Sequence, residues 1–189
     1  MSRENVLRSL TRAKSKTRPP LPNTAEQLVI NEHYSITHES ERFLFVDEMF
    51  DGERLLLFCS EFFLSLLFTA SIICCDGTFQ TVPTIFTQLF ILNLFYNGKL
   101  LPAVYVLTKR KNALLYRRLF ELLNHHARNR RMVFSPKEIV TDFEEAELLA
   151  INEEFPTSQY RECYFYFCQV IYYCIIYIKS IIIITFMKT

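Results

Sequence analysis

The chain has 189 residues, of which 50% are hydrophobic and 15% aromatic, so it can build one well-filled core and is not disordered over most of its length. A formal net charge of +1 excludes a protein that binds polyanions through overall charge alone. Only three glycines are present, and no phosphate-binding loop, Ser/His/Asp arrangement or Cys-x-x-Cys pair occurs.

Residues 1–24 form a basic, proline-rich leader. Six Arg and Lys side chains stand against one acid, Glu4, and three prolines between positions 19 and 22 exclude a continuous helix. The composition is typical of a disordered leader, and a nuclear-import or DNA-backbone arm is the alternative. Because no apolar stretch of a secretory signal is present, we expect a nuclear or cytoplasmic protein, not a secreted one, with reduced cysteines.

Residues 25–75 lead into the predicted core. His33 and His38 have the spacing of a zinc-finger histidine pair, but no cysteine pair precedes them, so we interpret both as surface residues. Residues 43–47 predict a short strand, and Asp51-Gly52 predicts the turn that follows it.

The 21 residues from Leu55 to Cys75 are almost wholly apolar and allow two interpretations. On length alone this run could cross a membrane, as could Val170–Met187. Glu61 would be costly inside a bilayer, and the run changes from helix-like Leu and Phe spacing to β-branched Ile72-Ile73. We therefore favour a core helix followed by a central strand without membrane association, and keep a small membrane protein as an alternative.

The next stretch predicts alternating strands and helices. Two strands, Thr87–Phe95 and Leu101–Leu107, pair as a hairpin around Asn97-Gly98. Asn112 then caps an amphipathic helix over Ala113–Ala127. A strand at 138–142, a helix from Glu144 to Glu154 that ends before Pro156, and a strand at Tyr160–Cys168 complete a mixed α/β pattern.

Two of these strands end in a carboxylate. The strand through Ile72-Ile73 delivers Asp76, followed by Gly77, which lets the backbone bend or a ligand approach. The strand that begins at Glu138 reaches Asp142, 66 residues after Asp76. Acids so far apart along the chain converge only if their strands are neighbours in one sheet. Convergent carboxylates would bind Mg²⁺ or Mn²⁺, because these ions prefer oxygen ligands.

The residues around both acids resemble a known family. The motifs stand in one order: Asp76-Gly77-Thr78-Phe79-Gln80, Phe86-Thr87-Gln88-Leu89, Leu101–Leu107 with Lys111 and Tyr116, Thr141-Asp142-Phe143-Glu144 with Phe155-Pro156, and Cys163–Gln169. In this order and spacing they resemble the transposase domain of Mutator-like elements (MULE), over about half of the chain.

The resemblance implies a fold, a reaction and a site. The fold would be an α/β RNase H-like mixed sheet flanked by helices, occupying residues 76–169 and incomplete at the C-terminus. The reaction would be metal-dependent cleavage and strand transfer of DNA at terminal inverted repeats, with Mg²⁺ or Mn²⁺ and no small-molecule cofactor. Asp76 and Asp142 would be the catalytic residues and the first two metal ligands. The alternative is that each simply caps a turn or a helix, and Asp142 could be an N-cap; we favour the metal-ligand interpretation, because the surrounding residues match as well.

The chain also departs from the family in two places. The family's third acid lies on a later helix, whereas no Asp or Glu follows Glu162 here, and Tyr166 stands where the family has a histidine. Whether one of Glu144, Glu145 or Glu147 could substitute stays open. We therefore expect a truncated and inactive transposase core, with residues 170–189 an Ile-rich tail of uncertain origin.

A non-enzymatic DNA-binding remnant is the alternative function. It would use the basic leader together with two basic loops, Lys109–Lys111 and Arg128–Arg131. Such clusters are more often a solvated surface. The sequence leaves the target DNA and the oligomeric state undetermined.

Overall fold

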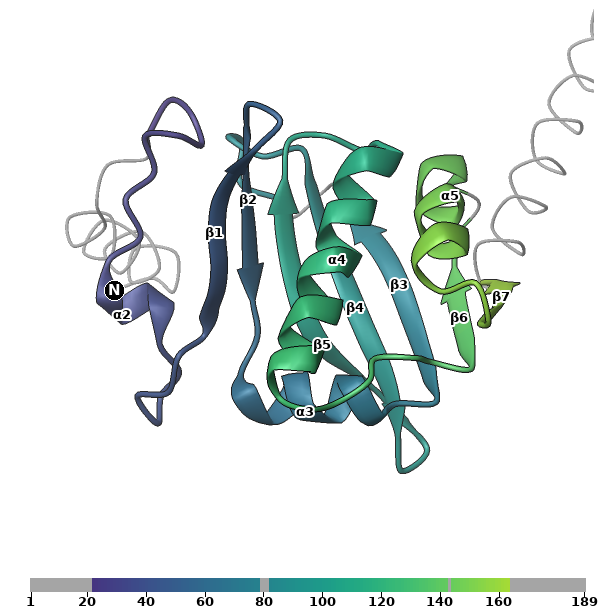
Figure 1. The fold of residues 1–189 in the computed structure, drawn as a ribbon. Helices are drawn as coiled ribbons and strands as arrows, with labels where there is room; N and C mark the ends of the chain where they lie inside the picture. The colour runs from purple at the N-terminus through teal and green to yellow at the C-terminus, as the bar shows by residue number, and fades with distance from the viewer. Residues whose placement is uncertain (1–21, 79–81, 143, 164–189) are drawn as a thin grey trace, which may run out of the picture.

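A computed structural model describes residues 22–78, 82–142 and 144–163. Within these residues the chain forms a seven-stranded mixed sheet in the order β1-β2-β5-β4-β3-β6-β7. In this order, adjacent strands among the first five, β1, β2, β5, β4 and β3, are antiparallel to each other. Strand β6 is parallel to both of its neighbours, β3 and β7. The expected mixed α/β class is confirmed. Figure 1 shows the two longest helices on the same face of this sheet.

Two hairpins form where the turn residues predict them. Strands β1 (Leu44–Phe50) and β2 (Glu53–Phe58) flank Asp51-Gly52, and β4 (Gln88–Tyr96) and β5 (Lys99–Thr108) flank Asn97-Gly98. Asn97 and Gly98 have φ angles of 49° and 74°. This left-handed backbone suits a two-residue hairpin turn, because Asn and Gly adopt it at low cost.

The apolar run from Leu55 to Cys75 contains three elements rather than the two predicted. Strand β2 continues to Phe58, helix α3 spans Glu61–Thr69, and strand β3 spans Ile72–Thr78. Leu55, Leu56 and Leu57 are all 0% exposed because β2 is covered on both faces, and this continuous burial hides the alternation that would have marked a strand. No helix in the described residues is long and apolar enough to cross a membrane, and Val170–Met187 lies outside them.

Helix α4 (Ala113–Asn129) begins where Asn112 caps it, as predicted, with the Asn112 side chain accepting a hydrogen bond from the Leu115 N–H at 2.9 Å. Its apolar side packs on the sheet, where the rings of Tyr116 and Phe90 lie 5.1 Å apart. Helix α5 (Glu145–Glu154) follows strand β6 (Glu138–Thr141) and packs beside α4 on the same face (Figure 1).

The ends of the described chain complete the sheet and its second face. Strand β7 (Gln159–Glu162) begins where the strand at Tyr160–Cys168 was predicted, and residues 164–168 lie outside the described residues. On the sheet face away from α4, Ala25 and Phe86 pack over Leu56 in a second apolar cluster. A short helix, α2 (Glu32–Ser35), precedes β1.

Candidate functional site

The register between β3 and β6 brings the two predicted acids to the same level. Parallel pairing joins Ile72 to Glu138, Ile73 to Ile139 and Cys74 to Val140, so paired residues differ by 66 positions. Continued to the ends of the strands, this register sets Asp76 beside Asp142. Both side chains then fall on one face of the sheet, because residues opposite each other in parallel strands point the same way.

That face is the one away from α4 and α5. Ile73, Cys75 and Ile139 are buried in the core with the apolar side of α4. Since side chains alternate along a strand, Asp76 points away from this core, and Asp142 continues the same alternation from β6. Asp76 lies within β3, two residues before its last residue, Thr78, and Asp142 directly follows β6; both are partly exposed. The prediction that their strands are neighbours in one sheet is confirmed.

The surroundings of Asp142 disfavour its negative charge. Half-burial raises the pKa of Asp142 above its ordinary value, the N–H of Glu144 opposes this, and the negative charges of Glu144 and Asp76 raise the pKa further. Lys111 supplies a positive charge that lowers it. The negative charge of Asp76 makes the smallest of these contributions to the pKa of Asp142, and a bound cation would offset it.

Asp142 is not the N-cap of α5, in contrast to one interpretation of the sequence. That position belongs to Glu144, whose side chain makes no capping hydrogen bond. Asp142 instead accepts a hydrogen bond from the backbone N–H of Glu144 at 3.0 Å, a local turn that fixes the direction of its carboxylate.

The three glutamates after Asp142 have different surroundings. Glu144 is paired with Lys111 at 3.2 Å and accepts a hydrogen bond from the Tyr116 hydroxyl at 3.1 Å. Glu145 is exposed. Glu147 is only 2% exposed and points into the core side of the sheet, away from the face of the aspartates.

Glu147 occupies a buried polar cluster beneath the two strand ends. Its neighbours are Cys75 and Thr141, the residues that directly precede Asp76 and Asp142. Burial raises the pKa of Glu147 to about 8, and contacts with Thr141 and Cys75 only partly oppose it. Among the residues that the structure describes, the Oε1 atom of Glu147 and the Oγ1 atom of Thr141 are buried and have no hydrogen-bond partner. Sequence reasoning missed this cluster, although the spacing of Glu147 from Ala150 and Ile151 places it on the buried side of α5.

The comparison with family models decides the family. Residues 72–170 match the MULE transposase domain, which is slightly more than half of the chain. The chain belongs to the MULE transposase family. No curated protein matches it. The matched stretch contains both aspartates, and Tyr166, where the chain departs from the family's histidine, lies outside the described residues.

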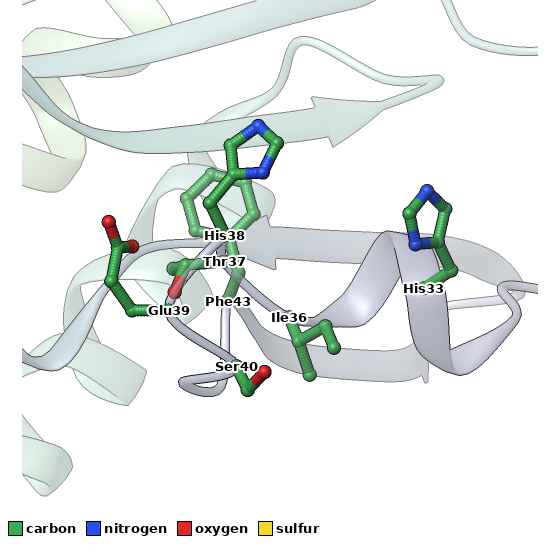
Figure 2. A pocket seen from close by; sticks show the side chains of 7 residues that line it. All are labelled: His33, Ile36, Thr37, His38, Glu39, Ser40 and Phe43. Carbon is green, nitrogen blue, oxygen red and sulfur yellow. The ribbon is translucent and has the colours of Figure 1, made fainter.

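Other candidate sites lie away from the aspartates of the MULE transposase domain. A surface hollow of about 580 Å³ is lined by residues of α2 and the following turn, including His33, His38 and Glu39. Figure 2 shows the two histidine side chains standing apart along this segment, with Glu39 pointing away from His33. Within residues 22–78, 82–142 and 144–163, no group of three or more His, Cys, Asp or Glu side chains could hold a metal ion.

Most cations of the two basic loops already have acidic partners. Lys109 pairs with Glu26 and Glu53, and Arg110 with Asp51 and Glu53. Lys111 pairs with Glu144, and Arg130 pairs with Glu61 at 2.6 Å. Arg128 and Arg131 are exposed. The paired cations would have to exchange a carboxylate for a phosphate, so these loops offer DNA less free charge than the sequence indicates.

Proposed function

We propose that this chain is a metal-binding transposase core in which Asp76 and Asp142 together hold Mg²⁺ or Mn²⁺. The observation that supports this most strongly is the register of β3 and β6, whose offset of 66 positions equals the separation of the two acids along the chain. Two adjacent carboxylates supply the oxygen ligands that these cations prefer. Half-burial is the main cause of the raised pKa of Asp142, and repulsion by Glu144 and Asp76 adds to it. A bound cation would offset both effects.

The reaction that the family resemblance implies for such a core is cleavage and strand transfer of DNA phosphodiesters at terminal inverted repeats. A divalent cation would supply activation of the attacking oxygen and stabilisation of the leaving oxygen. Asp76 and Asp142 would fix its position near the carboxyl ends of β3 and β6, and Lys111, whose charge acts on Asp142, would lie near a DNA phosphate bound there.

The RNase H-like fold is part of this proposal. From β3 onward the described elements run strand, strand, strand, helix, strand, helix, strand, which is the order that the family resemblance implies. In the sheet, β3 lies between antiparallel β4 and parallel β6, so the first acidic strand is central and the second is its direct neighbour.

Metal binding by matched variants tests the proposal. We expect Mn²⁺ to bind the full chain, as followed by the loss of the free Mn²⁺ signal in electron paramagnetic resonance. Asp76→Asn and Asp142→Asn should each weaken binding at least tenfold, because each removes a charged ligand. Glu145→Gln, an exposed carboxylate on the adjacent helix turn, should bind as the wild type does. Equal affinity in all four proteins would refute the site.

Cleavage is expected to be absent in this chain as it stands. Of the glutamates that follow Asp142, Glu144 is paired with Lys111 and Glu147 is buried, so neither is free to act as a third metal ligand beside the two aspartates. Metal-dependent nicking of inverted-repeat DNA that is lost in Asp76→Ala would show that this expectation of inactivity is wrong.

A further inference from the structure

Glu144 occupies an unusual position for its residue type. It is the N-cap of α5, where Ser, Thr, Asp or Asn would accept a hydrogen bond from the first turn, yet its side chain accepts none. The helix therefore begins without the usual stabilisation. Sites where a local rule is broken are often those where the side chain has another task.

The carboxylate of Glu144 is directed into a chain of buried hydrogen bonds. Its Oε1 atom accepts from the Tyr116 hydroxyl at 3.1 Å, and the Tyr116 oxygen accepts from the Gln88 side-chain amide at 3.1 Å. Tyr116 and Gln88 are both 0% exposed. The Tyr116 hydroxyl also lies 3.2 Å from the Gln88 Oε1 atom, but it has one proton to donate, and the carboxylate of Glu144 is the stronger acceptor.

Burial keeps Tyr116 in the form that can donate. It raises the pKa of the Tyr116 hydroxyl well above its ordinary value, and the negative charge of Glu144 adds to the effect. The contact therefore joins a neutral donor to an ionised acceptor, a stronger kind of hydrogen bond than one between two neutral groups.

The other contacts of Glu144 lead to the acid pair. Its Oε2 atom pairs with Lys111 in the loop before α4, at 3.2 Å. Its backbone N–H donates to the Oδ1 atom of Asp142 at 3.0 Å. Strand β4, helix α4 and the loop before α4 are thus all connected, through this one residue, to the carboxylate of Asp142.

We propose that Glu144 is a positioning residue of the metal site and that Tyr116 holds it in place. The inference rests on the proposed function of Asp76 and Asp142. Glu144 is not a substitute for the third acid, because both of its oxygens are already engaged by Tyr116 and Lys111. It acts instead through its backbone N–H, which holds the carboxylate of Asp142. Mutation of residues that hydrogen-bond a metal ligand commonly lowers metal affinity by about 10- to 100-fold.

Tyr116→Phe in the full chain tests the proposal, because it removes one hydroxyl and keeps the ring that packs on Phe90. Tyr105→Phe is the matched control, since within the described residues the Tyr105 hydroxyl has no hydrogen bond. Two quantities are measured: hydrogen exchange of the Glu144 amide by NMR without metal, and the Mn²⁺ dissociation constant. We expect Tyr116→Phe to speed exchange of the Glu144 amide and to weaken Mn²⁺ binding about 10- to 100-fold. Tyr105→Phe should change neither.

Glu144→Gln serves as a partial rescue, because its amide oxygen still accepts from Tyr116 although the charge that pairs with Lys111 is lost. Its Mn²⁺ affinity should lie between those of the wild type and Glu144→Ala.

An affinity for Tyr116→Phe equal to the wild type would overturn the positioning role, whereas the proposed function would stand. If the wild type binds no Mn²⁺ but Tyr116→Phe still speeds exchange at Glu144, the hydrogen-bond chain is upheld and the metal-binding function is refuted. Unchanged exchange at Glu144 would overturn the inference in either case.

Discussion

Among single residues, the buried Glu147 is the one that we expect to make the stability of the fold depend on pH. It is the one buried carboxyl group in the described part of the chain, and its enclosure between α5 and the ends of β3 and β6 favours the neutral acid. A neutral Glu147 places a proton donor next to Thr141 and Cys75, directly beneath the two aspartates. An ionised Glu147 would place an unpaired charge there.

The raised pKa of Glu147 makes a signed prediction about stability. The folded protein keeps this proton up to about pH 8, whereas the unfolded chain loses it near the ordinary value of 4.5. The contribution of Glu147 to the free energy of unfolding is therefore at its maximum below pH 4.5. It falls by about 1.4 kcal/mol per pH unit as the pH rises from there to 8. The amide of Glu147→Gln does not titrate in this range. The free energy of unfolding of this variant minus that of the wild type should therefore increase by roughly 3 kcal/mol from pH 4.5 to pH 7.

Urea unfolding of both proteins at several pH values measures this difference directly. Other carboxylates titrate in the same range, but they are common to both proteins and cancel in the comparison. A difference in unfolding free energy that does not change with pH would show that Glu147 is ionised, or hydrated, in the folded state.

At the scale of elements, the site depends on the register of β6 against β3 and on the N-cap of α4. The spacing of 66 residues between Asp76 and Asp142 equals the register offset of the parallel β3–β6 pair. A slip of one residue would turn one aspartate to the opposite face of the sheet. The buried pairing of Ile73 with Ile139 opposes such a slip, because it would expose one of these side chains.

The cap of α4 supports the site from the other side. Asn112 lies between Lys111 and the first turn of α4, and Tyr116 lies one turn later, so the cap helps to place both partners of Glu144. Asn112→Ala should lower the free energy of unfolding by about 1 kcal/mol, whereas Asn112→Asp, which keeps an accepting oxygen, should cost little. Thermal and chemical unfolding measure both. Equal losses in the two variants would mean that the side-chain cap contributes nothing to stability.

Sequence patterns predicted some of these elements better than others, for physical reasons. Asn97-Gly98 and Asn112 are local signals, because their backbone preferences act within a few residues, and both were confirmed. Strand β2 was missed because Leu55–Leu57 are buried on both faces and show no alternation. The tertiary partners of Glu144 and Glu147 could not be predicted, since they depend on how α4 and α5 pack on the sheet.

At the scale of the whole molecule, charge is distributed in local pairs. Arg54 illustrates this: it binds Asp47 through two nitrogens and also donates to the backbone oxygens of Ala25 and Leu28, which ties the N-terminal segment to β2. With the cations of the basic loops paired in a similar way, the site of DNA contact is better sought near the aspartates than on those loops. The net charge of +1 agrees with this, because it provides no general attraction to DNA.

Mn²⁺ added to the isotopically labelled chain can show by NMR whether one cation lies between the two strand ends. Its unpaired electrons broaden the signals of nearby amides, so we expect losses at Cys75–Thr78 and at Thr141, Asp142 and Glu144 at the same low Mn²⁺ concentration. Both sets should recover together in Asp76→Asn. Broadening confined to one strand, or centred on His33 and His38, would contradict a metal site shared by Asp76 and Asp142.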